Sequence, residues 1–310
     1  MKTKTELGQR IKEQRSAALI VNTHSRRGEK SYFRALDALQ ERGFTITASY
    51  RVQHPDRLPE VAREIIQQKE DLVIVGGGDG TISSIVDCFA YQEVVLGILP
   101  FGTGNSFART LGIPLTLEGA VDVIVHGKVA DVDLGKVDND YFANIATLGF
   151  SADVAGDSSP VLKNFFGPFA YLLAAIKHFF RHRSFSCTLR IDREVYTIKT
   201  HQVIIANGSF TGKTLLTPTI SLDDRGLIVF TMDMKNRWQM LELWPAFFLG
   251  KYHAFSGAKY FQTPAVRFET DPVQRVSVDG EVTTRTPVTV SLAPEALRVM
   301  VPQTFEDLDE

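Results

Sequence analysis

Glycines and one carboxylate are crowded together directly after a short apolar run of the sequence. Residues 72–75 are wholly apolar, which is typical of a strand buried on both faces. Three glycines, Asp79 and Gly80 follow, and Thr81 then begins a segment with helical apolar spacing, for which its hydroxyl predicts an N-cap. Such a strand, turn and helix start direct free backbone N–H groups at an anion, and glycine allows close approach. The pattern predicts a phosphate site at residues 77–81.

The carboxylate of Asp79 narrows the kind of phosphate that this turn would take. A carboxylate repels a phosphate unless a cation or a protonated donor lies between them. We therefore expect the phosphate of a metal–nucleotide complex. An ordinary tight turn between a strand and a helix is the alternative, but that turn needs one or two glycines, and this one has four.

A second glycine turn, Gly102-Thr103-Gly104-Asn105, follows the next apolar strand, residues 94–99, and enters another helix. Its glycines again allow close approach, and the side chains of Thr103 and Asn105 are short hydrogen-bonding groups suited to a ribose or a phosphate. A simple helix start is the alternative, but the neighbouring glycine turn favours a shared nucleotide site.

The first predicted strand, residues 17–21, also ends in polar residues, beginning with Asn22 and Thr23. Arg26 and Arg27 follow, and they could bind phosphates or belong to a solvated loop. Ligands of parallel sheets bind beyond the carboxyl ends of the strands. We therefore expect the three turns to converge on one site.

Two acidic turns occur in the second half of the sequence. The strand over residues 275–278 ends in Asp279-Gly280-Glu281, and Asp-Gly is the commonest signal for a hairpin corner. Transfer of a phosphoryl group to a hydroxyl needs a base for the alcohol's proton, and Asp279 or Glu281 could serve. Asp223-Asp224-Arg225-Gly226 reads as a turn, with a Mg²⁺ or structural cation site as the alternative.

Several familiar motifs are missing or incomplete. Residues 207–214 imitate a phosphate-binding P-loop, but Asn207 stands where that loop needs its first glycine. His178 and His182 stand four residues apart without the glutamate of a zinc protease between them. Neither the serine-hydrolase pattern Gly-x-Ser-x-Gly nor the dinucleotide pattern Gly-x-Gly-x-x-Gly is present.

The elements that must position these residues fall into two groups. Up to about residue 127, apolar strands alternate with helical patterns, which predicts an α/β domain with a parallel sheet and right-handed crossovers. Beyond residue 128 we expect an antiparallel, sandwich-like β domain. Its expected strands cover residues 131–137, 141–146, 187–191, 194–199, 202–206, 227–232, 266–269, 275–278, 288–291 and 297–301. The sequence therefore predicts a boundary near residue 128, between residues 1–128 and 129–310.

Composition restricts the classes of partner and compartment. The 310 residues carry a net charge of −2 without any block of like charges, so nothing indicates a nucleic-acid partner. Cys88 and Cys187 lie far apart, without metal or redox spacing. With no N-terminal signal peptide and no apolar run of membrane-spanning length, we expect a reducing cytoplasm.

Aromatic residues are concentrated in two stretches, residues 161–185 and 238–255, and the first ends in Arg181-His182-Arg183. Helices packed on the β domain are the simpler interpretation. The functional alternative is a wall for an acyl chain, and the aromatic and basic residues would suit a membrane interface.

Three of these segments together resemble the diacylglycerol-kinase-like lipid kinases, which include bacterial lipid kinases and sphingosine kinases. The segments are Gly77-Gly78-Asp79-Gly80-Thr81, Gly102-Thr103-Gly104-Asn105 and Asp279-Gly280-Glu281, and the resemblance covers nearly the whole chain. The first is shared with NAD kinases and phosphofructokinases, whereas the other two point to the lipid-kinase branch.

The resemblance implies an ATP-binding α/β domain over residues 1–128, a β-sandwich-like lipid-substrate domain over residues 129–310, and an active site in the cleft between them. Residues that it assigns to ATP are Asn22, Thr23, Gly77, Gly78, Asp79, Gly80, Thr81, Gly102, Thr103, Gly104 and Asn105. It places Asp79 near Mg²⁺ and among the catalytic residues. It also implies that Asp279 or Glu281 deprotonates the lipid, and that Asp224 and the carbonyl group of Leu227 hold a structural Mg²⁺.

The sequence departs from the family pattern at three positions. Thr23 stands where the family usually has proline, and Ser106 stands where many members have aspartate. Arg225 interrupts the family's Asp-Asp-Gly, which bears on the implied Mg²⁺ site.

These observations predict an ATP- and Mg²⁺-dependent kinase that phosphorylates the hydroxyl of a membrane lipid, such as diacylglycerol or a sphingoid base. We expect it in the cytoplasm, in peripheral contact with the inner face of the membrane. One alternative is an NAD-kinase-like enzyme with a soluble substrate. Another is a non-catalytic regulator that binds a nucleotide or a lipid. The lipid and the oligomeric state stay open.

Overall fold

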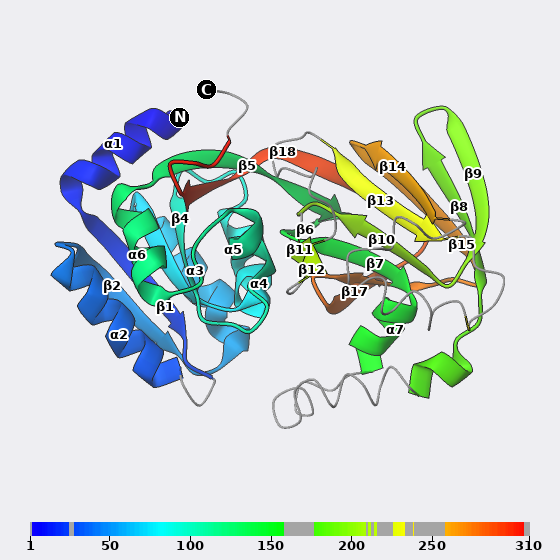
Figure 1. Cartoon of the computed structure of the whole chain (residues 1–310), viewed down its shortest axis with the longest axis horizontal. Coiled ribbons are helices and arrows are strands. Elements are labelled where there is room, and N and C mark those ends of the chain that lie inside the picture. Colours follow the sequence, from blue (N-terminus) through cyan, green and yellow to red (C-terminus); the bar gives the residue numbers. More distant parts are fainter. Residues whose placement is uncertain are drawn as a thin grey trace.

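The computed structural model describes residues 2–24, 28–157, 177–208, 210–211, 214–215, 226–232, 238 and 258–306. These residues form an N-terminal group of helices around a parallel sheet and a C-terminal group of antiparallel strands (Figure 1). The predicted fold class, an α/β region followed by a β-sandwich-like region, is thus confirmed.

Four parallel strands form the centre of the N-terminal region, in the order β2-β1-β3-β4. Their bounds are β1 Ser16–Asn22, β2 Thr45–Val52, β3 Leu72–Gly77 and β4 Val95–Pro100. Every residue of β3 and β4 is buried, as their apolar composition predicts for strands covered on both faces. Because the strands run in parallel, the polar residues after β1, β3 and β4 lie at one edge of the sheet.

Helices join and flank these strands. Their bounds are α1 Lys4–Gln14, α2 Gly28–Glu41, α3 Leu58–Gln67, α4 Asp79–Phe89, α5 Ser106–Thr110 and α6 Leu117–His126, with a 3₁₀ turn at Pro55–Arg57. Residues 1–15 are polar and mixed in charge, a pattern that fits either a loose terminus or a surface helix. Thr3 and Glu6 form a capping box, and Leu7 and Ile11 are buried, so residues 4–14 form a docked helix.

Two long strands connect the N-terminal and C-terminal regions. β5 (Lys128–Val137) pairs antiparallel with β18 (Val288–Val301), which also pairs with β4 at one end and with β15 (Ala265–Asp271) at the other. Figure 1 shows this pair as a band running from one region into the other. The ten-stranded sheet is therefore continuous across the molecule.

The C-terminal region packs the far part of this sheet against a second, six-stranded sheet in the order β14-β13-β10-β7-β16-β17. One core cluster takes side chains from both sheets, for example Phe185 and Phe268 from one and Leu148 and Val276 from the other. The remaining strands are β6 Asp140–Phe142, β7 Ile145–Gly149, β8 Phe185–Ile191, β9 Glu194–Thr200, β10 Gln202–Ala206, β11 Phe210–Thr211, β12 Thr214–Leu215, β13 Leu227–Met232, β14 Ala258–Thr263, β16 Arg275–Val278 and β17 Glu281–Arg285. The helix α7 (Phe150–Asp157) follows β7 directly.

Two predicted strand boundaries are wrong. The single strand expected over residues 141–146 is two strands, β6 and β7, separated by Ala143 and Asn144. Conversely, the two strands expected over residues 288–291 and 297–301 are one strand, β18, with a bulge between Ala293 and Leu297. Both errors lie at irregular backbone, which a repeating apolar pattern does not reveal.

In the part of the chain that the structure describes, no helix has both the length and the apolar character needed to cross a membrane.

Candidate active site

The three polar turns of the parallel sheet meet at its carboxyl edge. The Nδ2 atom of Asn22, at the end of β1, donates a hydrogen bond of 2.9 Å to the hydroxyl of Thr81 in α4. The other two turns touch through their backbones, because a Cβ added at Gly78 would lie 2.9 Å from the Cα of Gly102. The turns therefore form one continuous surface.

Close packing explains most of the glycines in the turn after β3, residues 76–80. A Cβ at Gly76 would lie 2.6 Å from the ring of Phe101, and one at Gly77 would lie 2.3 Å from the hydroxyl of Thr81. A Cβ at Gly80, in contrast, would meet no atom of the described residues within 4 Å. Among the described residues, Gly80 therefore borders open space of the kind that a bound phosphate needs.

The helix that follows this turn begins earlier than the sequence predicts. Thr81 is not its N-cap. The helix α4 begins at Asp79, Gly78 takes the cap position, and none of the described side chains caps the helix. The Thr81 hydroxyl instead receives the hydrogen bond from Asn22. An N-terminus without a side-chain cap leaves backbone N–H groups for an anionic ligand, so the change strengthens the case for phosphate binding.

The turn after β4, residues 102–105, is shaped by the side chain of Asn105. Asn105, which is buried, accepts a 2.9 Å hydrogen bond from the Gly102 amide and donates to the carbonyl oxygens of Pro100 and Gly102. Its amide group thus holds the turn closed, whereas Thr103 is exposed at the tip. Gly104 adjoins Thr103, and its carbonyl oxygen accepts a 2.9 Å hydrogen bond from the Nε of Arg109. Of the two polar side chains, that of Thr103 is the one placed to contact a nucleotide.

Asp79 joins the two helix N-termini. Its Oδ1 atom accepts a hydrogen bond of 3.4 Å from the amide of Phe107, in the first turn of α5. The backbone of Asn105, just before α5, is left-handed with φ of 52°. Asp79 therefore lies between two sets of backbone donors, which stabilise its negative charge.

The turn after β1 holds a buried polar atom. Thr23 is buried, and among the described residues its hydroxyl oxygen has no hydrogen-bond partner. Its backbone is packed closely, since a Cβ at Gly28 would lie 2.4 Å from the Thr23 Cα. Arg26 and Arg27, the predicted phosphate ligands of this turn, lie outside the described residues.

A carboxylate from the C-terminal region lies opposite these turns. The oxygens of Asp279 accept hydrogen bonds from three consecutive amides, those of Ala143, Asn144 and Ile145, at 2.9–3.1 Å. The hairpin corner expected here is present, with φ of 46° at Asp279 and 93° at Gly280. The carboxylate is thus fixed between the β16–β17 corner and the start of β7.

The surroundings of Asp279 perturb its acidity. Burial raises the pKa of Asp279 to about 6, and the three backbone hydrogen bonds only partly offset this effect. The negative charge of Asp79 raises the pKa further, which places the two carboxylates close enough to interact. This interaction ties the glycine turns of the N-terminal region to the acidic hairpin of the C-terminal region.

Glu281 differs from Asp279 in its exposure and in its hydrogen bonds. It is the first residue of β17 and is exposed. Within the described part of the chain, no hydrogen bond or ion pair holds its carboxylate. It is therefore free to reach a ligand beside the hairpin.

The metal ligands implied by the family resemblance are only partly visible. Leu227 is the first residue of β13 and is buried, and Asp224 lies outside the described residues. Asp79 borders the glycine turns as described above. Among the described residues, no group of three or more His, Cys, Asp or Glu side chains is arranged to hold a metal ion.

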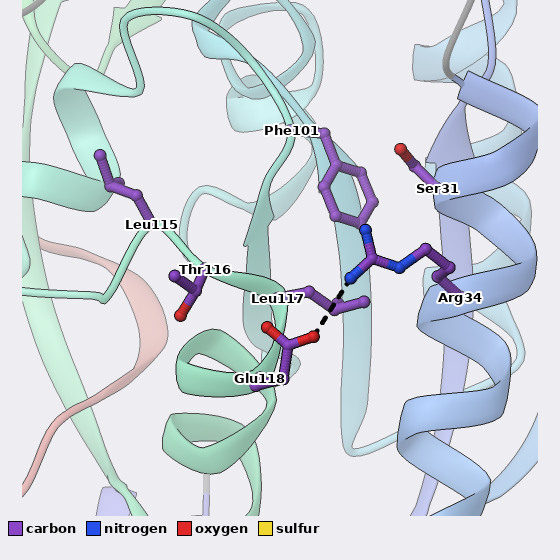
Figure 2. Close-up of a pocket in the computed structure, with 7 residues that line it drawn as sticks. All are labelled: Ser31, Arg34, Phe101, Leu115, Thr116, Leu117 and Glu118. Carbon is purple, nitrogen blue, oxygen red and sulfur yellow. Dashed lines mark hydrogen bonds and ion pairs between the residues drawn. The ribbon is translucent and has the colours of Figure 1, made fainter.

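A cavity of about 310 Å³ lies beside the second turn but is not the predicted site (Figure 2). Its lining residues are Ser31, Arg34, Phe101, Leu115, Thr116, Leu117 and Glu118. Figure 2 shows Arg34 of α2 extending toward Glu118 of α6, and their ion pair measures 3.1 Å. None of the residues predicted to bind a nucleotide lines this cavity, so we place the nucleotide along the glycine turns.

The site contains residues that sequence reasoning missed. The amides of residues 143–145 hold Asp279, and the buried side chain of Asn207 donates to the carbonyl oxygens of Asp133 and Ala143. Because any residue except proline can supply a backbone N–H group, the sequence does not identify these donors. Only Ala143-Asn144, small and polar residues between two apolar strands, could have indicated that this segment holds Asp279. In the sequence, Asn207 is marked only as the residue that interrupts a P-loop pattern.

Comparison with known proteins gives two matching family models. Residues 16–137 match the diacylglycerol kinase catalytic domain. Residues 144–301, over half of the chain, match the YegS C-terminal NAD kinase beta sandwich-like domain.

Individual relatives agree with these matches. A protein of Staphylococcus epidermidis named diacylglycerol kinase is 25% identical over 272 residues, which cover 87% of this chain and 86% of that protein. A Staphylococcus aureus protein of the same name is 27% identical over 250 residues, covering 80% and 79% of the two chains. A crystal structure of a diacylglycerol kinase from Bacillus anthracis has a TM-score of 0.74 at 20% identity and covers 94% of this chain and 98% of its own; this likeness shows the fold.

Proposed function

The chain belongs to the diacylglycerol-kinase-like family of lipid kinases, and we propose that it transfers the γ-phosphoryl group of ATP to a hydroxyl of a membrane lipid. It is a lipid kinase, and its kinase domain implies that it uses ATP. Diacylglycerol is our first candidate substrate, since two relatives carry that name, and a sphingoid base is the second.

The proximity of the two regions carries this proposal. A Cβ added at Gly208 would lie 3.0 Å from the hydroxyl of Thr110 in α5, and the Gly208 amide donates a 3.2 Å hydrogen bond to the carbonyl oxygen of Asn144. Asp79, beside the glycine turns, and Asp279, in the C-terminal hairpin, are close enough for one charge to raise the pKa of the other group. A phosphoryl transfer needs its phosphate site and its proton acceptor within such reach. We therefore assign ATP binding to residues 1–128 and lipid binding to residues 129–310.

The phosphate side of the reaction would rest on backbone donors. The N-terminus of α4, which has no side-chain cap, and the open space at Gly80 fit a phosphate, and exposed Thr103 would contact the nucleotide. Mg²⁺ would neutralise phosphate charge when bound, with Asp79 as its carboxylate ligand. The hydrogen bond from Phe107 to Asp79 would hold that carboxylate in place.

Glu281 is our choice for the proton acceptor, and Asp279 is a positioning residue. Both oxygens of Asp279 already accept backbone hydrogen bonds, whereas Glu281 is exposed. In the proposed step the lipid oxygen bonds to the γ-phosphorus and its proton passes to Glu281. The bond from the γ-phosphorus to the β–γ bridging oxygen breaks, and ADP leaves.

An assay with radiolabelled ATP and a panel of purified lipids tests the function. We expect label in a product that extracts into organic solvent, with diacylglycerol or a sphingoid base as acceptor. Label that stays in a water-soluble product would instead indicate a soluble substrate. A folded chain that binds ATP but labels no lipid in the panel would contradict the proposed substrate class.

The choice between the two carboxylates is tested with Glu281→Gln and Asp279→Asn. We expect Glu281→Gln to lower kcat by about a hundredfold or more while leaving thermal stability and ATP affinity unchanged, because only the proton acceptor is lost. Asp279→Asn should change stability as well as kcat. If Glu281→Gln keeps full activity, Glu281 is not the base.

A further inference from the structure

The cavity beside the turn after β4 takes no part in the proposed chemistry. Its volume of about 310 Å³ is at the lower end of the range for small-molecule sites and leaves room for roughly ten non-hydrogen atoms. Figure 2 shows Ser31 and Arg34 of α2 on one side of it and Leu115 and Thr116, which precede α6, on the other. The cavity is therefore a candidate site for a small ligand between two helices.

Part of the lining is apolar. Phe101, Leu115 and Leu117 are the apolar members, and Leu115 is 37% exposed. The hydroxyl of Thr116, in contrast, already accepts a 3.2 Å hydrogen bond from the amide of Gly119 and so caps α6. An aliphatic group laid against the three apolar residues would leave water and cover their apolar area, which is favourable. The cavity thus selects ligands that have an apolar part of limited size.

The charged part of the lining is one ion pair that joins the two sides of the cavity. Arg34 of α2 and Glu118 of α6 lie 3.1 Å apart, and their side chains are 56% and 68% exposed. An ion pair this exposed contributes little to stability, so a ligand can separate its members at small cost. The separated pair offers a guanidinium on one side and a carboxylate on the other.

Charge complementarity selects a ligand that carries both signs of charge. A carboxylate on the ligand would bind the guanidinium of Arg34, and an ammonium group would bind the carboxylate of Glu118. A purely anionic ligand would take Arg34 from Glu118 and repel that carboxylate, and a purely cationic ligand would do the converse. An α-amino acid carries both groups on one carbon atom and can insert between two side chains that lie in contact. Its side chain would then lie on the apolar part of the lining.

We propose that this cavity binds an apolar α-amino acid, and that the bound amino acid strengthens the binding of ATP. The second part rests on the proposed function, because it needs the nucleotide on the glycine turns. Phe101 connects the two sites: its amide donates a 2.8 Å hydrogen bond to the carbonyl oxygen of Gly77, and its ring would lie 2.6 Å from a Cβ at Gly76. A ligand packed on this ring would hold the glycine turn in one conformation, and preorganisation of a site raises its affinity.

A second ion pair supplies a matched control. Arg42, which follows α2 directly, and Asp122 of α6 lie 2.9 Å apart, and both are exposed. This pair joins the same two helical segments as Arg34 and Glu118, but neither of its members lines the cavity. Its removal should disturb the contact between the helices to a similar extent without changing the proposed ligand contacts.

Isothermal calorimetry of the full chain without ATP tests the site. The probes are leucine, isocaproate, which lacks the amino group, and isoamylamine, which lacks the carboxylate. We expect leucine to bind at least about tenfold more tightly than either of the other two, because leucine alone satisfies both charged side chains.

Variants of the two ion pairs test the contacts. Arg34→Gln and Glu118→Gln should each weaken the binding of leucine about tenfold, because each removes one charged partner. Arg42→Gln should bind leucine like the unaltered chain. Thermal melting of the three variants verifies that each is folded. An equal loss in the control variant, equal binding of the three probes, or no binding of leucine overturns the amino-acid site.

The coupling between the cavity and the glycine turns is tested in both directions. Saturating leucine should lower the Kd of ATP about fivefold, and saturating ATP should lower the Kd of leucine by the same factor. An unchanged ATP affinity overturns the coupling. Competition between leucine and ATP overturns the proposal as well, because it would place the nucleotide in the cavity. A chain that binds leucine but neither binds ATP nor labels a lipid contradicts the proposed function and leaves the amino-acid site standing.

Discussion

The carboxylate of Asp279 is held by three backbone N–H groups of consecutive residues, yet burial keeps its pKa high, at about 6. Backbone donors stabilise the charged form, whereas loss of water destabilises it, and here the loss of water has the larger effect. A carboxylate in this balance costs stability when it is charged. Functional sites commonly contain buried carboxylates with such perturbed pKa values, because burial and hydrogen bonds fix the side chain in one position.

This balance predicts how stability depends on pH. The folded chain binds the Asp279 proton more tightly than the unfolded chain, so the stabilising contribution is fully present below about pH 4 and is lost as pH rises through about 6. Relative to Asp279→Asn, the free energy of unfolding of the unaltered chain should fall by roughly 3 kcal/mol over that range. Urea unfolding of both proteins at a series of pH values measures it. Parallel pH curves for the two would contradict the assignment.

The hydrogen bond between Asn22 and Thr81 is a second feature at the residue scale. It joins the end of β1 to the first turn of α4 and is partly buried, with a length of 2.9 Å. Asn22→Ala and Thr81→Val should each cost about 1–3 kcal/mol, because each leaves a partner without its hydrogen bond. The double variant should cost less than the sum of the two, as measured by chemical unfolding in a double-mutant cycle. Strict additivity would mean that the bond contributes nothing.

At the scale of elements, the strand–turn–helix units were largely predictable from the sequence. Apolar runs marked β1, β3 and β4, and the Asp-Gly pair at 279–280 marked the β16–β17 corner, because those signals are local. The predicted N-cap of α4 is wrong by three residues. Thr81 is a good cap by residue type, but its hydroxyl accepts a hydrogen bond from Asn22 at the end of β1. Tertiary contacts of this kind have no local signature.

The glycine turns give a prediction with a built-in control. Gly78→Ala would press a Cβ within 2.9 Å of the Cα of Gly102, so we expect a loss of about 1–3 kcal/mol of stability together with weaker ATP binding. Gly80→Ala meets open space and should leave stability unchanged or slightly higher, because alanine lowers the entropy of the unfolded chain. Thermal melting measures the stability of both variants.

The same Gly80→Ala methyl would occupy the space assigned to phosphate. Isothermal calorimetry with ATP should therefore show a weaker Kd for Gly80→Ala despite its intact fold. An unchanged ATP affinity in that variant would place the phosphates elsewhere.

At the scale of the whole molecule, the two regions share strands. β5 and β18 contribute side chains to both hydrophobic cores: Leu134 and Leu297 to the first, and Val137 and Val290 to the second. The sequence did not indicate this sharing, because Pro294 and the bulge divide β18 into two apparent strands. Pairing between strands far apart in the chain also leaves no local pattern. The change of sequence pattern near residue 128 therefore indicates where the α/β architecture gives way to antiparallel strands. It does not indicate a boundary between independently folded domains.

Shared strands predict cooperative unfolding of the described regions. We expect a single calorimetric transition, with equal calorimetric and van't Hoff enthalpies, because neither core is complete without β5 and β18. ATP at a hundred times its Kd should raise the stability of that one transition by about 2.7 kcal/mol. Two calorimetric transitions, of which ATP raises the midpoint temperature of only one, would show that the regions unfold separately.

The position of β18 also has a consequence for how the protein is made. β4 is flanked by β3 on one side and by β18 on the other, and the chain reaches β18 only about 190 residues after β4 ends. At ribosomal speeds of roughly 5–20 residues per second, the open edge of β4 must wait on the order of ten to forty seconds for its partner. The N-terminal region therefore cannot finish folding during its own synthesis, and it exposes an unpaired apolar strand until β18 leaves the ribosome.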